Sequence, residues 1–184
     1  RRNLIAALCF APFADRQAFA DENAMRIAAL DWAWAESALV LGMVPLAVAE
    51  APLYRERVVA PDLPMAVTDL GLRSWPNMEL LKSLRPDLIL AQAGYGPSAD
   101  QLKPTAPVLA LPLYAAERRP LHNAEAGLSA IAVAIGRGGM AEDYLAAAER
   151  LFERLHLRLK AYDNRPLLLI KFADDRLIDI YGPG

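Results

Sequence analysis

The sequence contains few of the residues that bind metals or form covalent bonds, with one cysteine and two histidines among its 184 residues. Cys9 has no second cysteine to pair with, and His122 and His156 lie far apart in segments of helical pattern. Motifs of common enzymes are also absent: there is no G-x-S-x-G, no G-x-x-x-x-G-K-[ST], and no G-x-G-x-x-G after a strand. We therefore expect no metal site, no cofactor and no enzymatic activity.

An excess of charge of one sign is likewise lacking, because 20 lysines and arginines stand against 22 aspartates and glutamates, for a net charge of -2. No broad basic surface is expected, so nucleic acid is not an expected partner. The 14 prolines are dispersed, and no low-complexity tract or repeat is present. With 55% hydrophobic residues, the chain is long enough for one sizeable domain, or for one domain and part of another.

The first 20 residues have the order of a secretory signal peptide. Two arginines precede a short apolar stretch, and an A-x-A pattern at 18–20 comes before Asp21. The paired arginines also resemble a twin-arginine signal, and the apolar stretch is too short for a permanent membrane anchor. The alternative is an amphipathic first helix. We expect export and removal of residues 1–20, which leaves a mature protein without cysteine.

Apolar segments of strand length alternate with segments of helical periodicity from residue 26 to residue 112. This alternation is typical of a parallel sheet covered by helices on both faces. Segment 51–64 contains several prolines and is expected to be a loop. The expected strands are 26–31, 44–50, 67–71, 87–92 and 107–112, and the expected helices are 34–43, 77–85 and 98–104.

Two of the expected strands end in glycine-containing loops with side chains suited to binding. "TDLGLRSW" places Arg73 and Trp75 after one strand, and "LAQAGYGPS" places Tyr95 after another. Ligands of parallel sheets bind outside the carboxyl ends of the strands, so these side chains are expected to share one rim. The alternative is that Arg73 is a solvated loop charge and Tyr95 an ordinary turn residue.

A long helix is expected at 140–163, because leucines recur at near-helical intervals with charges between them and no glycine or proline interrupts them. It follows a helical pattern at 123–137 that glycines break. After it, "PLLLIKF" and "LIDIYG" are typical of two strands joined by a turn at Asp174–Asp175. The chain lacks an initiating methionine and closes on this strand pattern, so we expect it to be part of a longer protein.

Three stretches, in order along the chain, resemble the periplasmic ferric-hydroxamate siderophore-binding proteins of bacterial ABC importers. They are "RIAALDWAWAESALVLGMVPLAVAE", "TDLGLRSWPNMELLKSLRPDLILAQAGYGPS" and "RPLLLIKFADDRLIDIYGPG". The most specific pieces are G-L-R before a Pro-Asn-x-Glu-Leu-Leu helix and A-G-Y-G-P-S after a strand. The resemblance implies two α/β lobes joined by one long helix, with the ligand held between the lobes.

The sequence patterns and the resemblance together divide the chain into four parts. The patterns predict a signal peptide at 1–20 and a long helix at 140–163, and the resemblance implies an N-terminal ligand-binding lobe at 25–139, a connecting role for that helix and the start of a truncated C-terminal lobe at 164–184. The expected fold class is therefore α/β, with a mostly parallel sheet covered by helices in the first lobe.

The resemblance also implies roles for individual residues. Arg73 matches the arginine that contacts hydroxamate oxygens in this family, Tyr95 matches its tyrosine, and Trp32 stands at a tryptophan position in a strand-to-helix turn. Arg57 departs from the family, because a well-known member has tryptophan there, and Trp75 is the expected substitute for that aromatic contact. The iron of a ferric trihydroxamate is already fully coordinated, so the protein needs donors for the ligand oxygens and apolar surface rather than metal ligands.

Glu79 stands where this class offers a carboxylate to arginines of the membrane permease, and its alternative role is to favour the start of a helix through the helix dipole. The implied function is that of a monomeric periplasmic receptor that captures ferric hydroxamates and delivers them to an ABC permease. Closely related alternatives change the ligand to a catecholate siderophore, haem or cobalamin. A small doubly wound α/β enzyme is a more distant alternative.

Overall fold

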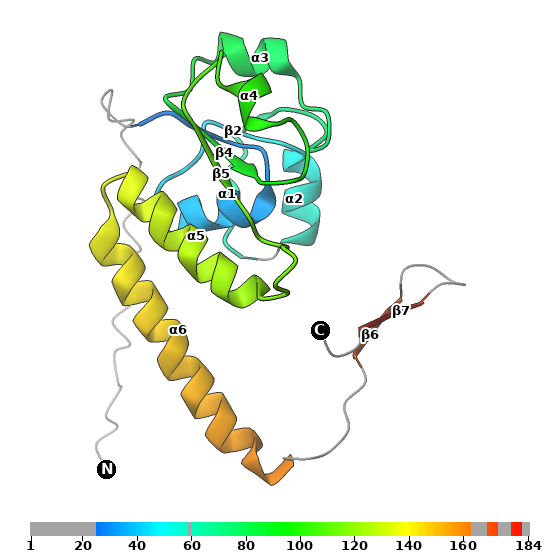
Figure 1. Cartoon of the computed structure of the whole chain (residues 1–184), viewed down its shortest axis with the longest axis vertical. Helices are drawn as coiled ribbons and strands as arrows, with labels where there is room; N and C mark the ends of the chain where they lie inside the picture. Colours follow the sequence, from blue (N-terminus) through cyan, green and yellow to red (C-terminus); the bar gives the residue numbers. More distant parts are fainter. Residues whose placement is uncertain (1–24, 59, 163–168, 173–177, 182–184) are drawn as a thin grey trace, which may run out of the picture.

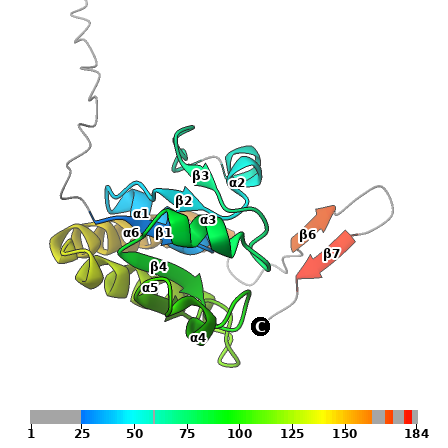
Figure 2. The same cartoon turned by 90° about the horizontal axis from the view of Figure 1, so that it is seen from above.

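The computed structural model contains one five-stranded parallel sheet, with β1 at its centre and the strand order β3-β2-β1-β4-β5. Figure 2 shows β3, β2, β1 and β4 side by side in this order. The strands are β1 (Ile27–Ala29), β2 (Ala47–Val48), β3 (Thr68–Asp69), β4 (Leu88–Gln92) and β5 (Val108–Leu111). The structure describes residues 25–58, 60–162, 169–172 and 178–181, and the expected signal peptide, Cys9 and the turn at Asp174–Asp175 lie outside them.

Helices cover both faces of the sheet, as its apolar strands require. On one face, Ile27 and Ala29 pack in a buried cluster with Trp34 of α1. On the other face, Ala28 packs in a second cluster with Leu81 of α3. Successive residues of β1 thus point into different cores, which explains why this strand is a continuous apolar run. The covering helices are α1 (Trp32–Val40) and α5 (Pro120–Ala134) on the first face, and α3 (Met78–Ser83) and α4 (Ala99–Leu102) on the second (Figure 1).

The expectation of a loop at 51–64 is wrong at its beginning, because α2 occupies Ala51–Arg57. Pro52 lies in the first turn of this helix, where a missing N–H removes no intrahelical hydrogen bond. The Oδ1 atom of Asp69 accepts a hydrogen bond from the Ala51 N–H at 3.0 Å. The start of this helix therefore depends on Pro52 and on Asp69 of β3. The contribution of Asp69 cannot be seen in the local sequence, because that residue is distant along the chain.

The helix expected from Asn77 is confirmed as α3, and Pro76, a residue type that often forms the first turn of a helix, lies outside it. Asn77 is the N-cap residue, and its Oδ1 atom accepts a hydrogen bond from the Leu80 N–H at 2.9 Å. An asparagine at this position satisfies one of the free N–H groups at the start of a helix. Pro76 is buried just before the cap, and its backbone forms an isolated β-bridge with Gly71.

Helices α1 and α5 pack closely because a glycine faces a tryptophan across their contact. The added Cβ of an alanine at Gly127 of α5 would collide with ring atoms of Trp34 of α1. Trp34 is fully buried, so its ring has no room to move away. The glycine therefore sets the distance at which this part of the core closes.

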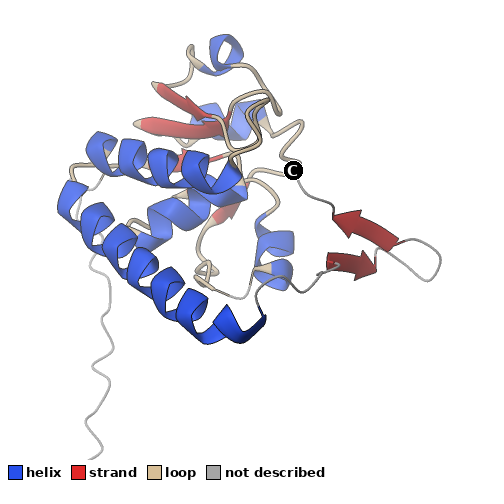
Figure 3. Ribbon diagram, turned by 60° about the horizontal axis from the view of Figure 1, so that its bottom comes forward, coloured by secondary structure: helices blue, strands red, loops and turns tan. Residues whose placement is uncertain are grey.

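The long helix is one unbroken α-helix, α6 (Gly138–Leu159), followed by a 3₁₀ turn at Lys160–Tyr162. Gly138 and Gly139, which were expected to interrupt the helical pattern, form its first turn. The helix begins beside α5 and then extends past it (Figure 3). No helix in the described ranges is long and apolar enough to cross a membrane. Strands β6 (Leu169–Phe172) and β7 (Ile178–Tyr181) pair with each other in antiparallel register.

Candidate ligand-binding site

Loops that follow four adjacent parallel strands meet at the carboxyl edge of the sheet. Trp32 follows β1, Glu50 follows β2, Arg73 follows β3 and Tyr95 follows β4. The chain leaves β1 and β4 toward opposite sides of the sheet, which is the arrangement that opens a crevice at the strand ends in parallel α/β folds. The expectation of a shared rim for the loops after β3 and β4 therefore describes the observed geometry.

Arg73 is the centre of this group. The carbon of its guanidinium lies 4.1 Å from the ring centroid of Trp32, within the range of a cation–π contact. The same carbon lies 6.0 Å from the ring centroid of Tyr95, at the outer limit of that range. The Arg73 side chain is 27% exposed and Tyr95 is 44% exposed, so both remain accessible from solvent. Three of the four residues expected to bind ligand are thus neighbours in space.

Two carboxylates hold Arg73, and neither was identified from the sequence. The Nε–H of Arg73 donates to Oε2 of Glu50 at 2.8 Å, and its backbone N–H lies 3.4 Å from Oε1 of the same carboxylate. The Nη1 atom lies 3.8 Å from Oδ2 of Asp31. Asp31 and Glu50 each come directly after an apolar strand segment. Position after a strand was the signal that identified Arg73 and Tyr95, and the same signal could have identified these two carboxylates.

The ring of Trp32 is held in a fixed orientation. Its Nε1–H donates to the backbone carbonyl of Ala49 at 3.0 Å, and its ring meets Tyr54 edge to face at 6.0 Å. The hydroxyl of Tyr54 donates to the carbonyl of Pro61 at 3.0 Å, and burial is the main cause that raises the pKa of Tyr54 to about 12. Trp32 therefore offers Arg73 a rigid aromatic face.

Asp31 is the N-cap residue of α1 and is almost completely buried. Its Oδ1 atom accepts a hydrogen bond from the Ala33 N–H at 3.0 Å. Burial raises the pKa of Asp31 above its usual value, and this effect exceeds the opposing effects of the Ala33 N–H and the Arg73 guanidinium. The Asp31 carboxyl group thus caps the start of α1 and also lies close to the Arg73 guanidinium.

The loops after β3 and β4 approach each other closely at Gly96. A Cβ atom added there would lie 2.7 Å from the carbonyl oxygen of Arg73, and Gly96 has a φ of 72°. Both features favour glycine, because a side chain would push the loops apart and would strain this backbone conformation. The glycines around Tyr95 therefore allow the tyrosine loop to lie beside the arginine loop.

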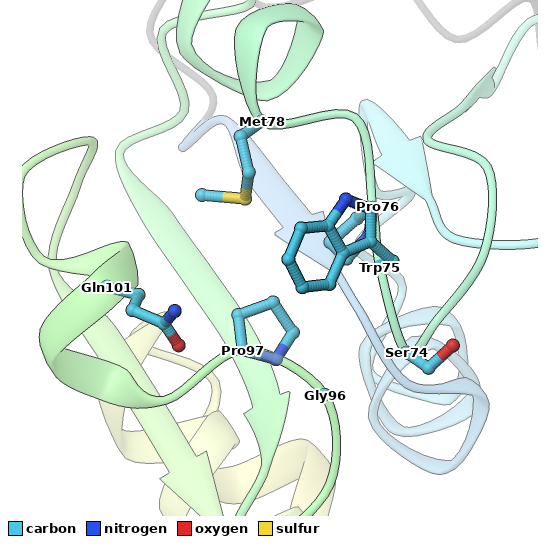
Figure 4. A pocket seen from close by; sticks show the side chains of 7 residues that line it. All are labelled: Ser74, Trp75, Pro76, Met78, Gly96, Pro97 and Gln101. Atoms are coloured by element: carbon cyan, nitrogen blue, oxygen red, sulfur yellow. The ribbon is translucent and has the colours of Figure 1, made fainter.

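Trp75 lies apart from the other three aromatic and cationic residues of the rim. It is 81% exposed and lines a small pocket of about 150 Å³ with Met78, Pro97 and Gln101. Figure 4 shows its ring beside Pro97, between the loop of Arg73 and the start of α4. The pocket joins the same two loops as the Arg73 group, so Trp75 extends the apolar part of the rim.

The remaining candidates lie on exposed surface. Glu79 is an exposed residue in the first turn of α3, and Arg57 is exposed at the last residue of α2. His122 and His156 are exposed on two different helices. Within the described residues, no group of three or more histidine, cysteine or carboxylate side chains is placed to hold a metal ion. Hydrogen-bond donors and apolar surface characterise this site.

A parallel α/β lobe with a cationic and aromatic rim at its strand ends is typical of proteins that bind small ligands at the edge of the sheet. The comparison with known families agrees with this class. The chain belongs to the periplasmic binding protein family, whose sequence pattern matches residues 27–184.

Two known proteins are similar in sequence to this chain. The iron(3+)-hydroxamate-binding protein FhuD of Escherichia coli K12 is 36% identical, and the match covers 100% of this chain and 63% of FhuD. A putative ABC transporter substrate-binding lipoprotein, YhfQ of Bacillus subtilis, is 30% identical, with 85% of this chain and 48% of YhfQ covered. The chain thus spans less than two thirds of the length of these relatives.

A solved structure shares the fold. The siderophore-binding protein FhuD of Vibrio cholerae, with Fe3+–Desferal bound, superposes with a TM-score of 0.77 at 30% identity. The match covers 85% of this chain and 60% of that protein. These comparisons confirm the resemblance that the sequence motifs indicated and the expected α/β fold class.

Proposed function

We propose that the native protein is an exported receptor that captures a ferric hydroxamate siderophore and delivers it to an ABC permease for iron uptake. Membership of the periplasmic binding protein family supports a role in binding rather than catalysis. The similarity to an iron(3+)-hydroxamate-binding protein and to a siderophore-binding protein with Fe3+–Desferal bound supports the ligand class. The iron is cargo in this proposal, because it arrives fully coordinated by the siderophore.

The observation that carries this proposal is the Arg73 guanidinium, which rests on Trp32 and is open to solvent beside Tyr95. Within the described residues, neither Nη atom of Arg73 makes a hydrogen bond. These donors are therefore available to hydroxamate oxygens, which carry partial negative charge. A hydrogen bond to a charged group contributes about 1.5–3 kcal/mol, enough for one arginine to affect affinity strongly.

The other residues of the rim supply direction and apolar contact. The Tyr95 hydroxyl is a single donor on a rigid ring, suited to one further ligand oxygen. The exposed ring of Trp75 and the accessible part of the half-buried Trp32 ring offer apolar surface to the organic arms of a siderophore, at about 25 cal/mol for each Å² removed from water. A ligand that combines negative oxygens with apolar arms matches this combination of groups.

Ligand identity is tested by titrating the native protein with a panel of chelates and following tryptophan fluorescence. Ferric trihydroxamates should quench the fluorescence in a saturable manner at lower concentrations than a ferric tricatecholate, haem or cobalamin. A zinc or free ferric salt serves as a control for binding of metal without a chelator. Tighter binding of haem or cobalamin than of any ferric hydroxamate would contradict the proposed ligand class.

Delivery to a permease is the second part of the proposal, and Glu79 is the residue expected to contribute to docking. Its carboxylate is exposed at the start of α3, on the second face of the sheet and outside the Arg73 contacts. Glu79→Ala should leave ferric hydroxamate affinity within about twofold, because no described contact joins Glu79 to Arg73. Uptake of the iron-55 chelate by cells should become slower. A loss of affinity well above 1 kcal/mol, about fivefold, would place Glu79 in the ligand site instead.

A further inference from the structure

Arg73 is an ion-paired cation rather than a free one. Its Nε–H donates to Glu50 at 2.8 Å, and the Glu50 side chain is only 18% exposed. Asp31, with a side chain only 6% exposed, lies behind the guanidinium at 3.8 Å. No second lysine or arginine forms an ion pair with these carboxylates within the described residues. The charge of Arg73 is therefore offset before any ligand arrives.

The backbone around Glu50 is built to hold its side chain at Arg73. Glu50 has a φ of 53° and a ψ of 42°, a left-handed conformation that is uncommon for residues other than glycine. Its N–H donates to the carbonyl of Gly71 at 2.7 Å, and its carbonyl accepts from the Tyr54 N–H at 2.9 Å. Such conformations persist where the surroundings determine them, and they cluster at ligand-binding positions.

Asp69, and not Glu50, accepts the hydrogen bond that caps the start of α2. Glu50 is the N-cap residue of α2, but its side chain makes no capping hydrogen bond. The Oδ1 atom of Asp69 accepts from the Ala51 N–H instead, at 3.0 Å, and from the Gly71 N–H at 3.2 Å. The Glu50 carboxylate is thus free to bind Arg73 with both of its oxygens facing that residue.

We propose that Glu50 sets the ligand charge that this site accepts. By offsetting the charge of Arg73 and fixing its orientation, Glu50 favours ferric chelates of low net charge, such as trihydroxamates, over strongly anionic ones, such as tricatecholates. The proposal rests on the receptor function proposed above and adds the residue that determines its selectivity.

The physical reason is that Glu50 acts on the two classes of chelate in opposite directions. A neutral chelate is attracted by directed hydrogen bonds from the Nη atoms, which the Glu50 contact keeps in place. A trianionic chelate is in addition repelled by the carboxylate, and charges a few Å apart near a protein surface interact by several kcal/mol before screening. Removing the carboxylate therefore weakens the first interaction slightly and strengthens the second.

The test compares Glu50→Gln with wild type in the native protein. Affinities for a neutral ferric trihydroxamate and a ferric tricatecholate are measured by fluorescence quenching at low and high salt. Glutamine keeps the size of the side chain and an oxygen acceptor for the Arg73 N–H groups while removing the charge. The ratio of the two affinities should move by about tenfold or more toward the tricatecholate, and the shift should shrink at high salt.

Two further variants separate charge from structure. Glu56→Gln removes an equal charge from an exposed position on the same helix and should leave the ratio unchanged. Glu50→Asp keeps the charge and should retain the preference of wild type for the trihydroxamate. If Glu56→Gln shifts the ratio as much as Glu50→Gln, total protein charge is the cause and the assignment to Glu50 is refuted.

The outcomes distinguish this inference from the receptor function on which it rests. If wild type binds the trihydroxamate but Glu50→Gln weakens both chelates in equal proportion, Glu50 has only a structural role and the selectivity inference is overturned. The receptor function stands in that case. If wild type binds neither chelate, or prefers the tricatecholate, the proposed hydroxamate receptor fails and the selectivity inference fails with it.

Discussion

Individual side chains at the carboxyl edge of the sheet each make several contacts. Arg73 pairs with two carboxylates and lies over the ring of Trp32 and near that of Tyr95, while Trp32 begins a helix and supports a cation. Such combinations make the site compact, because each group is oriented by a neighbour before a ligand binds. They also mean that a substitution here affects both ligand affinity and local order, so each test requires a matched control.

At the scale of one residue, Arg73→Ala should reduce ferric hydroxamate affinity by about ten- to a hundredfold, corresponding to about 1.5–3 kcal/mol. Tyr95→Phe removes only an uncharged donor and should cost less, about 0.5–1.5 kcal/mol. Fluorescence titration of the native protein gives both values. Lys82→Ala, at an exposed position of α3, is the control and should bind as wild type does. Equal losses for Tyr95→Phe and Arg73→Ala would contradict the assigned roles.

Asp31 should make the stability of the protein depend on pH. Because burial raises the pKa of this carboxyl above its usual value of 3.8, the folded state holds the proton more tightly than the unfolded chain. The stability from this group is therefore fully present below about pH 3.8 and is lost as pH rises through the raised pKa of the folded state. Asp31 also contributes to the raised pKa of Glu36, after the effect of burial, and this acts in the same direction.

Asp31→Asn provides the measurement, since asparagine keeps the N-cap acceptor for Ala33 and does not titrate. Urea unfolding should show that the free energy of unfolding of the variant, relative to wild type, rises as pH increases through this window. A difference that stays constant from acid to neutral pH would show that the folded and unfolded states hold this proton equally.

At the scale of secondary structure, packing between helices depends on a few small residues. Helix α5 reaches α1 where Gly127 faces the ring of Trp34, and α6 begins beside α5 through the buried Ala141. The core on this face of the sheet closes at these contacts. The loops that carry the site begin at the carboxyl ends of the strands that these helices cover.

Gly127→Ala should destabilise the fold although alanine is the better helix former. Alanine gains up to about 1 kcal/mol in helix propensity, while overpacking against the buried Trp34 costs about 1–3 kcal/mol. We expect a net loss of about 1–2 kcal/mol in the free energy of unfolding. Gly139→Ala is the control, because an added Cβ there meets no atom within 4 Å, and it should be neutral or stabilising. Stabilisation by both substitutions would disprove the close α1–α5 contact.

At the scale of the whole molecule, one edge of the sheet carries the candidate site, while the long helix α6 begins on the face covered by α1 and α5 (Figure 1). A single stiff helix limits hinge motion where it connects two lobes, and the connecting role of α6 remains a prediction. The chain spans 63% of the length of FhuD of Escherichia coli, and a second lobe that closes the ligand site remains a prediction.

Export of the native protein should remove residues 1–20, because the order of basic residues, apolar stretch and A-x-A pattern is that of a cleaved signal. Mass spectrometry of the protein isolated from the cell envelope should show an N-terminus near Asp21. Ala20→Arg places a large charged residue directly before the cleavage point and should cause the precursor to accumulate. Retention of Arg1 in the exported, folded protein would contradict this prediction.

Much of the fold is predictable from the sequence because it depends on local patterns. The apolar runs from 26 to 112, the breaks at Gly42 and Pro86, and the leucine spacing after residue 140 identify strands and helices. The expected loop at 51–64 failed for a physical reason. A proline in the first turn is compatible with a helix. The hydrogen bond from the Ala51 N–H to Asp69 also favours the helix, but it can be foreseen only when β2 and β3 are known to be neighbours.

The candidate site divides in the same way. The sequence by itself determined that Arg73, Trp75 and Tyr95 follow strands, and the family motifs added Trp32. Only the tertiary structure decided which of these side chains meet, and it brought Glu50 and Asp31 to Arg73 while placing Trp75 beside Pro97. The reason is that a carboxylate at a strand end looks locally like an ordinary helix cap. Glu50 and its partner Arg73 are 23 residues apart in the sequence. They meet only because parallel strands bring their carboxyl ends to one edge of the sheet.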